Sequence, residues 1–355
     1  MRLTKTLLLI LFINLIILDP GHMEPGQQQR SYSKQEIEKM RKKNLKKYPL
    51  PENAIELELK YSFPSEELLD RYVYLYGARF ISKDPSENIY ISNSRAHNLF
   101  KFDSSGKFLA RFGRKGQGPG ELDGPFRIMV TEDYIIVHEN GNRRVQFLDK
   151  KGRYVKSFKT FKTYLDMSMN NDGLIFATPI LMSEKSYLID VLTQDGKLLY
   201  SFGKPKALDC TEVKLAFNNK RELLVAFEHF PIVRKYSEKG ELLAEYKIDY
   251  KIMNYKEKIN LKRINSLSKG RNRGYAVIID AIRPSEEGFY VLHQALRTEI
   301  LEFDKDGDLI NTYWHDDVES YTSDFLIQNK GDEKIFHVLK VSPENRIDVF
   351  ALKNQ

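Results

Sequence analysis

A recurring pattern of apolar and polar positions divides most of the chain into similar units. Five times an apolar residue is followed four positions later by Gly, with an apolar residue two places after that Gly and an aromatic residue six places after it. The even spacing places the apolar residues on one face of a strand, and Gly supplies the positive φ that a tight turn requires. Each unit is therefore predicted to be a β-hairpin. The five sets are Phe102, Gly106, Phe108, Phe112; Leu148, Gly152, Tyr154, Phe158; Leu192, Gly196, Leu198, Phe202; Tyr236, Gly240, Leu242, Tyr246; and Phe303, Gly307, Leu309, Tyr313.

The spacing of these hairpins matches the blades of a β-propeller. The glycines stand 46, 44, 44 and 67 residues apart, and the first three intervals are the length of a four-stranded blade. The longer interval predicts an insertion near residues 250–274, where a Lys-rich polar stretch interrupts the pattern. A short apolar strand precedes each hairpin, and we assign these as the inner strands of the blades: Ile89–Ile91, Ile135–Val137, Leu174–Phe176, Leu223–Val225 and Phe289–Leu292.

A sixth unit is one strand short at the C-terminal end. It contains three predicted strands, and the missing strand is supplied from the other end, where residues 55–63 alternate apolar and polar positions. Pairing this segment with the last unit closes the ring and removes free sheet edges. The sequence thus predicts an all-β fold, a six-bladed β-propeller of four-stranded antiparallel blades closed by an N-terminal strand. The three strands are 325–327, 335–339 and 347–352.

The N-terminal segment has the features of an export signal. Arg2 and Lys5 precede an apolar run over residues 7–18, which Asp19, Pro20 and Gly21 end. The run is shorter than the roughly 20 residues of a membrane-spanning helix and suits a signal peptide. Because no small-x-small cleavage pattern follows it, an uncleaved anchor over residues 1–29 is the alternative. We expect export to the periplasm, the cell surface or the medium.

A basic amphipathic helix is predicted over residues 33–47. Ser33 and Glu36 form a capping box, and Ile37, Met40 and Leu45 give a thin apolar stripe among lysines and an arginine. We interpret residues 30–50 as a solvated helical spacer before a propeller body over 51–355. Membrane association through residues 1–47 is the alternative, because basic amphipathic helices bind anionic lipid.

Composition limits the classes of partner. The net charge is +7, but residues 1–48 contain ten basic and four acidic residues, so the body is nearly neutral. A nucleic-acid-binding body would need a basic surface, and no nucleic-acid partner is predicted. Cys210 is the single cysteine of the sequence, which rules out an intramolecular disulfide and a cysteine-based zinc site.

One stretch resembles the NHL-repeat family of propellers. It runs from the strand at Ile89–Asn93 through Phe100 and Gly106 to the glycine-rich linker at residues 113–122. The linker glycines allow a sharp turn between blades, and Pro119 stiffens it. A phosphate-binding loop is disfavoured because this stretch follows an outer strand and no helix begins after it. The resemblance is greatest to exported six-bladed propellers of bacteria with undefined roles, and the wider family includes binding platforms, RNA-binding proteins, lyases and lactone hydrolases. Fold alone does not choose among these.

Polar residues at the ends of the predicted inner strands are the candidate site. If they face the central channel, His, Glu and Asn side chains there could bind a ligand or hold Zn²⁺ or Ca²⁺. The alternative is that each one caps its strand or faces solvent, and His337, within an apolar strand, is interpreted as structural. The candidates are Asn93, His97, His138, Glu139, Glu228, His229 and His293.

No catalytic motif accompanies these candidates. The sequence contains neither Gly-x-Ser-x-Gly nor His-Glu-x-x-His, and Cys210 has no assignable partner. The prediction is therefore an exported, monomeric, non-catalytic propeller that binds a protein or small-molecule ligand at one face, with no cofactor assigned. A metal-assisted lyase or lactone hydrolase is the alternative, and an RNA-binding module is the less favoured third hypothesis.

Overall fold

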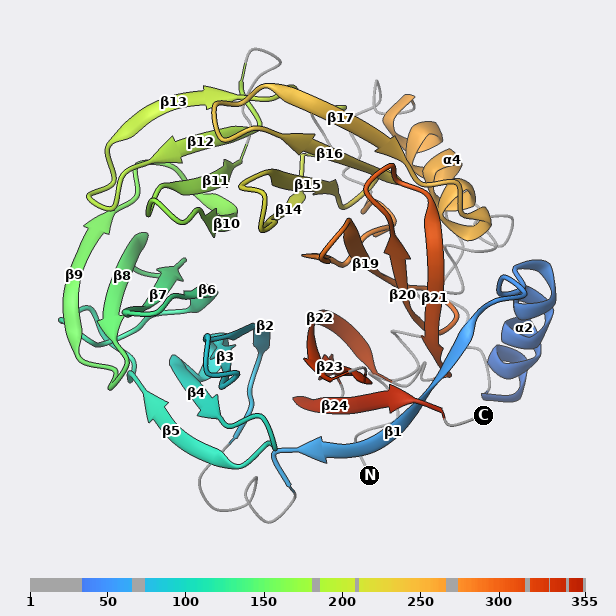
Figure 1. Cartoon of the computed structure of the whole chain (residues 1–355), viewed down its shortest axis with the longest axis horizontal. Coiled ribbons are helices and arrows are strands. Elements are labelled where there is room, and N and C mark those ends of the chain that lie inside the picture. Colours follow the sequence, from blue (N-terminus) through green and yellow to red (C-terminus); the bar gives the residue numbers. More distant parts are fainter. Residues whose placement is uncertain are drawn as a thin grey trace, which may run out of the picture.

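Short antiparallel β-sheets are arranged in a ring around a central axis (Figure 1). The computed structural model describes residues 34–65, 74–180, 186–207, 211–265, 274–316, 320–331, 333–342 and 345–353. The predicted signal or anchor over residues 1–29, Ser33 and Cys210 lie outside the described residues. Five sheets make up the ring, four of them with four strands and one with eight.

The four-stranded sheets follow one another along the chain, each ordered from the axis outwards. The strands are β2 (Ala78–Lys83), β3 (Ile89–Asn93), β4 (Asn98–Phe102) and β5 (Phe108–Phe112); β6 (Pro125–Val130), β7 (Tyr134–Glu139), β8 (Arg144–Asp149) and β9 (Tyr154–Lys159); β10 (Tyr164–Met169), β11 (Ile175–Pro179), β12 (Ile189–Leu192) and β13 (Leu198–Phe202); and β14 (Val213–Phe217), β15 (Leu223–Phe227), β16 (Ile232–Tyr236) and β17 (Leu242–Lys247). A short 3-10 turn (Ser94–Ala96) joins β3 to β4.

The eight-stranded sheet contains both ends of the ring. Its strands, in spatial order, are β18 (Ala281–Pro284), β19 (Phe289–Gln294), β20 (Thr298–Phe303), β21 (Leu309–His315), β1 (Ile55–Phe63), β24 (Asn345–Leu352), β23 (Glu333–Ser342) and β22 (Tyr321–Lys330). The predicted N-terminal strand therefore forms with the predicted bounds, and it pairs antiparallel with β24 from Leu57 opposite Leu352 to Phe63 opposite Ile347. A parallel contact of two residue pairs joins β1 to β21, so this sheet is two four-stranded halves connected at β1.

The assignment of the inner strands was wrong. The short apolar strands of the sequence are β3, β7, β11, β15 and β19, which are second from the axis, while β2, β6, β10, β14 and β18 lie nearest to it. The second strands are buried on both faces by the strands of neighbouring sheets and are therefore the most apolar: every residue of β3, β11 and β15 is buried.

The hairpin glycines explain the sequence repeat. The backbone at Gly152 has φ of +78°, and a Cβ there would overlap the ring of Phe112 from the preceding sheet. The same relation links the next hairpin glycines to the preceding outer-strand aromatics, in the pairs Gly196 and Phe158, Gly240 and Phe202, and Gly307 and Tyr246. Gly106 packs in the same way against Phe63 of β1. The aromatic residues six places after Gly106, Gly152, Gly196 and Gly240 thus pack on the hairpin of the following sheet.

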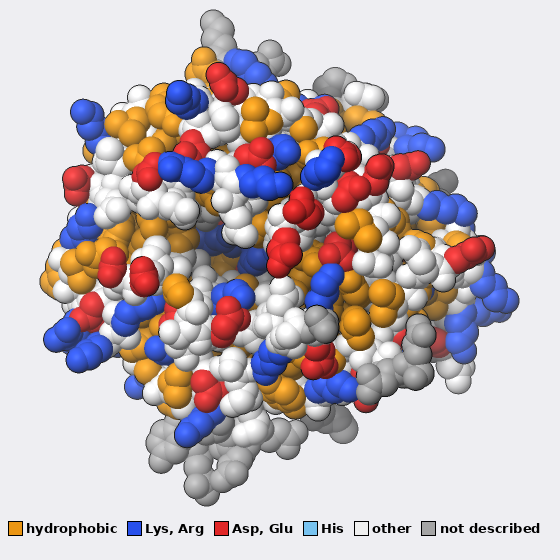
Figure 2. Space-filling view, viewed as in Figure 1, with side chains coloured by type: hydrophobic (Ala, Val, Ile, Leu, Met, Phe, Trp, Pro, Cys, Tyr) orange, Lys and Arg blue, Asp and Glu red, His pale blue; other side chains and the backbone are white. Residues whose placement is uncertain are grey.

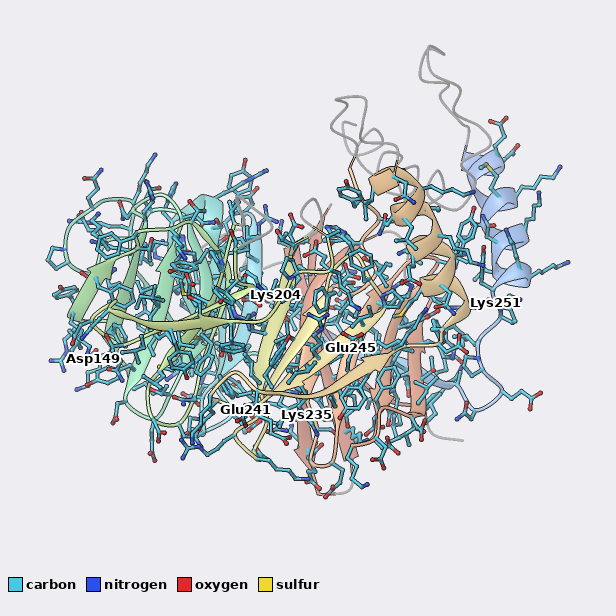
Figure 3. The ribbon with its side chains drawn as sticks, turned by 90° about the horizontal axis from the view of Figure 1, so that it is seen from above. Asp149, Lys204, Lys235, Glu241, Glu245 and Lys251 are labelled. Atoms are coloured by element: carbon cyan, nitrogen blue, oxygen red, sulfur yellow. The ribbon has the colours of Figure 1, made fainter. Side chains whose placement is uncertain are left out.

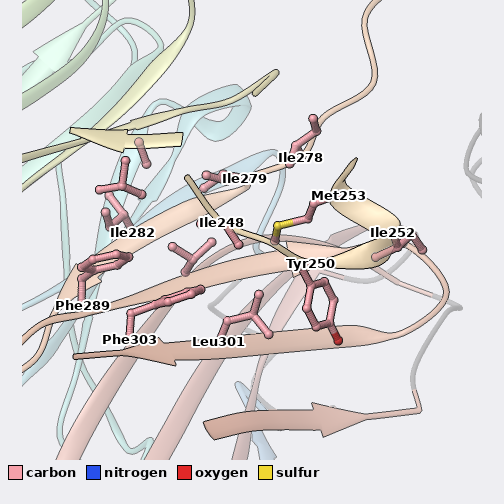
Figure 4. Packing of buried hydrophobic residues seen from close by; sticks show 14 of the residues in the cluster. Ile248, Tyr250, Ile252, Met253, Ile278, Ile279, Ile282, Phe289, Leu301 and Phe303 are labelled. Carbon is pink, nitrogen blue, oxygen red and sulfur yellow. The ribbon is translucent and has the colours of Figure 1, made fainter. Parts of the chain in front are cut away.

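Two helices cover one edge of the ring. Helix α2 (Lys34–Lys47) precedes β1, and α4 (Lys251–Asn265) lies in the predicted insertion. The insertion is thus helical through residue 265, and it is integrated into the core: Ile252 and Met253 pack with Ile248 and Leu301 in one cluster (Figure 4). Burial of each such aliphatic side chain contributes about 1.5–3 kcal/mol, which holds α4 against the ring.

Helix α2 is also packed against the ring, which corrects its interpretation as a solvated spacer. Arg41, Asn44 and Tyr48 are buried, and Arg41 forms an ion pair with Asp316. Arg297 donates a hydrogen bond to the Tyr48 carbonyl at 2.9 Å. The predicted stripe therefore identified the helix but not the polar residues that dock it.

Candidate functional site

A cavity lies on the axis of the ring. It has a volume of about 770 Å³ and is lined by residues from all of the strands nearest the axis, β2, β6, β10, β14, β18 and β22. The hairpins after β6 and β10 form part of its rim. Figure 2 shows the central hollow, with Lys and Arg side chains visible inside it. The volume is in the range of small-molecule sites, which is about 300–1,000 Å³.

Charged residues recur at one level of these innermost strands. On four innermost strands, the residue just before the one that pairs with the middle of the neighbouring second strand is charged. These residues are Arg127 on β6, Asp166 on β10, Lys214 on β14 and Asp324 on β22. Arg283 stands one residue after that position on β18. Because side chains alternate along a strand, all five lie on the same side of their sheets.

Arg127 lines the cavity and is fixed from two neighbouring strands. Its Nε lies 3.0 Å from the Asp166 carboxylate and donates to the Met167 carbonyl, and one terminal nitrogen donates to the Leu215 carbonyl at 3.2 Å. The guanidinium also lies 4.7 Å from the ring centre of Phe80. These contacts hold the planar group in one orientation, as a binding site requires.

Arg283 lines the same cavity from β18. It is paired with Asp324 of β22, and it donates to the carbonyl of Ile81 on β2 at 3.2 Å. Burial lowers the pKa of Arg283, and the positive charge of Arg127 lowers it further. The charges of the two guanidiniums therefore repel each other within one cavity.

The carboxylates that pair with these arginines do not line the cavity. The two oxygens of Asp166 accept the backbone N–H groups of Met167 and Leu215, and burial raises the Asp166 pKa although Arg127 opposes this. Asp324 accepts the N–H groups of Ile81 and Phe325. The base of the cavity therefore presents two cationic groups while their counter-charges face the protein.

The sequence-predicted candidates lie at the ends of second strands and serve local structure. Asn93 is buried, accepts the Tyr76 N–H at 2.6 Å and donates to the Tyr74 carbonyl. His97 is a left-handed residue with φ of +56°, and its Nδ1 accepts the Gly124 N–H. Asp123 lies 3.0 Å from the same nitrogen. These two candidates connect β3 and β4 with the following sheet.

Glu139 and His138 are both buried at the end of β7, and Glu139 lies beside the end of the glycine-rich linker. Glu139 is 0 % exposed and accepts from Arg144 at 2.6 Å, from Asn142 at 2.7 Å and from the Asp123 N–H at 2.8 Å. His138 packs edge-on against Phe126, and burial lowers its pKa to about 4. The imidazole is therefore neutral at neutral pH.

Glu228 and His229 lie at the connection that follows β15. Glu228 pairs with Lys214 at 2.6 Å, and although burial opposes the lysine charge, Glu228 raises the Lys214 pKa. The Nδ1 of His229 bonds to the Ala276 carbonyl, and its Nε2 lies 3.3 Å from Glu212. Burial lowers the His229 pKa, but Glu212, Glu228 and the Ala276 carbonyl together outweigh burial, so the pKa is raised.

His293 is part of a buried charged cluster beneath α4. Its Nδ1 bonds to the Ile278 carbonyl at 2.6 Å, and burial lowers its pKa well below the ordinary value. The Nζ of Lys256, from α4, donates to the carbonyls of Val277 and Gln294. Asp280 accepts a hydrogen bond from Tyr321 at 3.0 Å, and burial raises its pKa to about 6.

The histidines do not converge. Within the described part of the chain, no group of three or more His, Cys, Asp or Glu side chains is arranged to hold a metal ion. The three buried imidazoles among the candidates instead bond to or pack against separate partners: Phe126 for His138, Ala276 for His229 and Ile278 for His293. Their arrangement does not fit the Zn²⁺ or Ca²⁺ ring considered from the sequence, and no reaction step is assigned to a metal.

Lys256 gives the buried cluster a measurable pH dependence. Burial lowers the Lys256 pKa to about 8, against an ordinary value of 10.5. The unfolded chain then binds more protons than the native protein between these values, so native stability should rise from pH 8 to 10.5, by at most about 1.4 kcal/mol per pH unit. We expect K256M to lose this rise in urea unfolding measured across that range. Lys251→Met, exposed on the same helix, should retain it; equal slopes for K256M and the native chain would contradict the assignment.

Sequence reasoning missed the cavity arginines. Arg127 stands between Phe126 and Ile128, and Asp166 between Leu165 and Met167, so each is a single charge within an apolar stretch just before the recognised second strand. A buried charge in a strand needs a partner, and this is the signal that could have located the axis.

Comparison with known proteins supports the fold. No family model matches the chain. The Drosophila melanogaster protein brain tumor is 24 % identical over 136 residues, which are 36 % of this chain and 12 % of that protein. A candidate exported protein from Bacteroides fragilis has a TM-score of 0.61 at 14 % identity, with 86 % of this chain and 98 % of that chain covered.

Two further solved structures share the architecture. A DUF4221 family member from Bacteroides vulgatus has a TM-score of 0.56 at 13 % identity, covering 86 % of this chain and 100 % of that chain. A streptogramin B lyase has a TM-score of 0.52 at 14 % identity, covering 84 % and 88 %. At these identities the similarity shows a propeller-like all-β fold. None of the helices in the described ranges is long and apolar enough to span a bilayer.

Proposed function

We propose that this chain is an exported, non-catalytic β-propeller that binds a small anionic molecule in the cavity on its axis. The observation that carries the proposal is the pair of guanidiniums, from Arg127 and Arg283, that line one cavity while their carboxylate partners bond to the backbone behind them. A carboxylate or phosphate between them would accept charge-assisted hydrogen bonds and relieve their mutual repulsion.

The blade count is part of this proposal. We assign the eight-stranded sheet as two blades, β18–β21 and β22–β24 with β1, which makes six in all. Phe63 supports this, because it packs on Gly106 as Phe112 packs on Gly152, and so occupies the outer-strand position of a last blade. Six blades place the cavity at the common axis of the ring, where one ligand can contact several strands. The likeness of blade one to NHL repeats is consistent with this count.

The cavity lining favours binding over catalysis. Among the described lining residues the acidic side chains are Glu132, Asp133 and Asp172, which stand on the rim hairpins, and no histidine or cysteine is present. The alternative of a metal-assisted lyase or lactone hydrolase has its support in the fold shared with streptogramin B lyase. Elemental analysis of the purified chain for zinc and calcium, followed by assay of lactone turnover with each metal, tests that alternative.

A thermal-shift screen tests the binding proposal. Citrate, sugar phosphates and N-acetylated amino acids would be compared with neutral sugars of similar size. At 100 times its Kd a ligand stabilises the native state by about 2.7 kcal/mol, so an anionic ligand should raise the Tm of the native chain measurably. Ser168→Phe, which places a ring in the cavity from β10, should abolish the shift.

A matched variant separates cavity filling from destabilisation. Ser157 is exposed on the outer strand β9, so Ser157→Phe should bind the same ligand as the native chain. Retention of the shift by Ser168→Phe, or equal shifts with neutral sugars and anions, would show that the arginine-based cavity is not the binding site.

A further inference from the structure

Two basic helices lie side by side at one edge of the ring. Helix α2 contains seven basic and two acidic residues, and α4 contains five basic residues and one acidic residue. Figure 3 shows both helices at this edge, with the long side chains of α2 directed away from the ring, and Figure 2 shows Lys and Arg side chains gathered where α2 lies. We propose that these helices form a docking surface for anionic lipid, an interaction distinct from ligand binding in the cavity.

The face of α2 that packs against the ring determines which of its residues are exposed to solvent. Arg41, Asn44 and Tyr48 follow one another at helical spacing and are buried against the ring. The remaining faces carry Lys39, Lys42, Lys43 and Lys46, which are all exposed. A free helix could turn these lysines in any direction, but the buried contacts fix them as one outward charged surface.

Helix α4 extends this surface. Tyr48, which follows α2, lies 5.7 Å from the ring of Tyr255 on α4, and Lys47 lies over the same Tyr255 ring. The exposed residues of α4 include Lys258, Leu261 and Lys262, and Leu261 is 42 % exposed. An exposed leucine between lysines suits a lipid interface, where apolar groups enter between headgroups that the lysines contact.

The position of the surface in the chain favours lipid over nucleic acid. Lysines near an anionic bilayer each increase binding several-fold. The apolar run over residues 7–18 ends fifteen residues before α2, and fifteen extended residues span at most about 50 Å. If that run enters a membrane during export or as an anchor, α2 is held within this distance of the lipid surface. The body has no comparable excess of charge to bind a polyanion.

Vesicle sedimentation with the full chain tests the proposal. Partition onto vesicles of phosphatidylglycerol mixed with phosphatidylcholine would be compared with partition onto phosphatidylcholine alone, which measures any contribution of the N-terminal apolar run. We expect the anionic lipid to increase binding, and the increase to fall by about 100-fold or more when Lys39, Lys42, Lys43 and Lys46 are all changed to Gln.

The control carries the same change of charge at another face. Lys107, Lys151, Lys197 and Lys239 are exposed lysines next to hairpin glycines in four sheets, and their replacement by Gln should leave the lipid-dependent increase unchanged. Both variants should retain the native Tm because the lysines are exposed. Equal losses in the two variants, binding that does not depend on phosphatidylglycerol, or stronger binding to RNA than to these vesicles would overturn the proposal.

Discussion

Replacing Arg144 by Met is expected to lower the free energy of unfolding by about 3–5 kcal/mol, because it leaves the carboxylate of Glu139 buried without its cation. Glu139 is fully buried, and the Nε of Arg144 donates to it at 2.6 Å. The other guanidinium nitrogens donate to the carbonyls of Gln117, Gly118 and Glu121. The variant therefore loses both the ion pair and the support of the glycine-rich linker.

Arg153→Met provides the matched control for urea unfolding. Arg153 lies in the turn between β8 and β9 of the same sheet and pairs with Asp149 at 2.6 Å, the same distance as the buried pair, but its side chain is 74 % exposed. Exposed pairs contribute about 0–1 kcal/mol, so this variant should unfold almost as the native chain does. The double variant E139Q/R144M should recover part of the loss because it removes the uncompensated charge. A small effect of R144M alone, with altered ligand binding, would return Glu139 to the candidate site residues.

The internal contacts of the glycine-rich linker argue against its interpretation as a phosphate-binding loop. The carboxylate of Glu121 accepts the Gly118 N–H at 2.9 Å, and added Cβ atoms on Gly116 would overlap that carboxylate. The linker glycines thus make room for an internal side chain, and Arg144 bonds to the carbonyls around it. The loop is filled by the protein itself.

Local signals predicted the hairpins and the closing strand. Gly106, Gly152, Gly196, Gly240 and Gly307 all have positive φ, as turn chemistry requires. The strict alternation of residues 55–63 identified β1, although only Leu57 and Phe63 among its apolar residues are buried and Leu59 and Tyr61 are exposed. Such features depend on neighbours within a few residues, so a single sequence contains them.

Contacts between distant residues were not predictable in this way. The polar residues of the innermost strands have partners such as Ile81 for Asp324, 243 residues apart. Without those partners Arg127 and Asp166 looked like interruptions in apolar sequence, whereas His138 and His293 at strand ends looked like ligands. The direction in which each side chain points depends on the strand order from the axis, and the sequence did not contain that order.

The contact between each hairpin glycine and an outer-strand aromatic ring should also contribute strongly to the free energy of unfolding. We expect Gly152→Ala to lower the free energy of unfolding by about 3 kcal/mol or more, since the left-handed backbone costs about 1–2 kcal/mol with a Cβ and the Phe112 ring must move as well. Gly120 has φ of +77°, close to the +78° of Gly152, and no atom lies within 4 Å of the position of its Cβ. Gly120→Ala should therefore show the backbone cost alone.

The difference between these two variants measures the contact between adjacent sheets. In F112L/G152A the smaller side chain should relieve part of the overlap, so the double variant should be more stable than the sum of the two single effects predicts, in denaturant unfolding of all four proteins. Equal destabilisation by G152A and G120A would mean that the aromatic ring moves aside without cost. The repeated glycine would then be required only for the conformation of the turn. Adjacent sheets would be held together by the apolar cores between them, without a contribution from this contact.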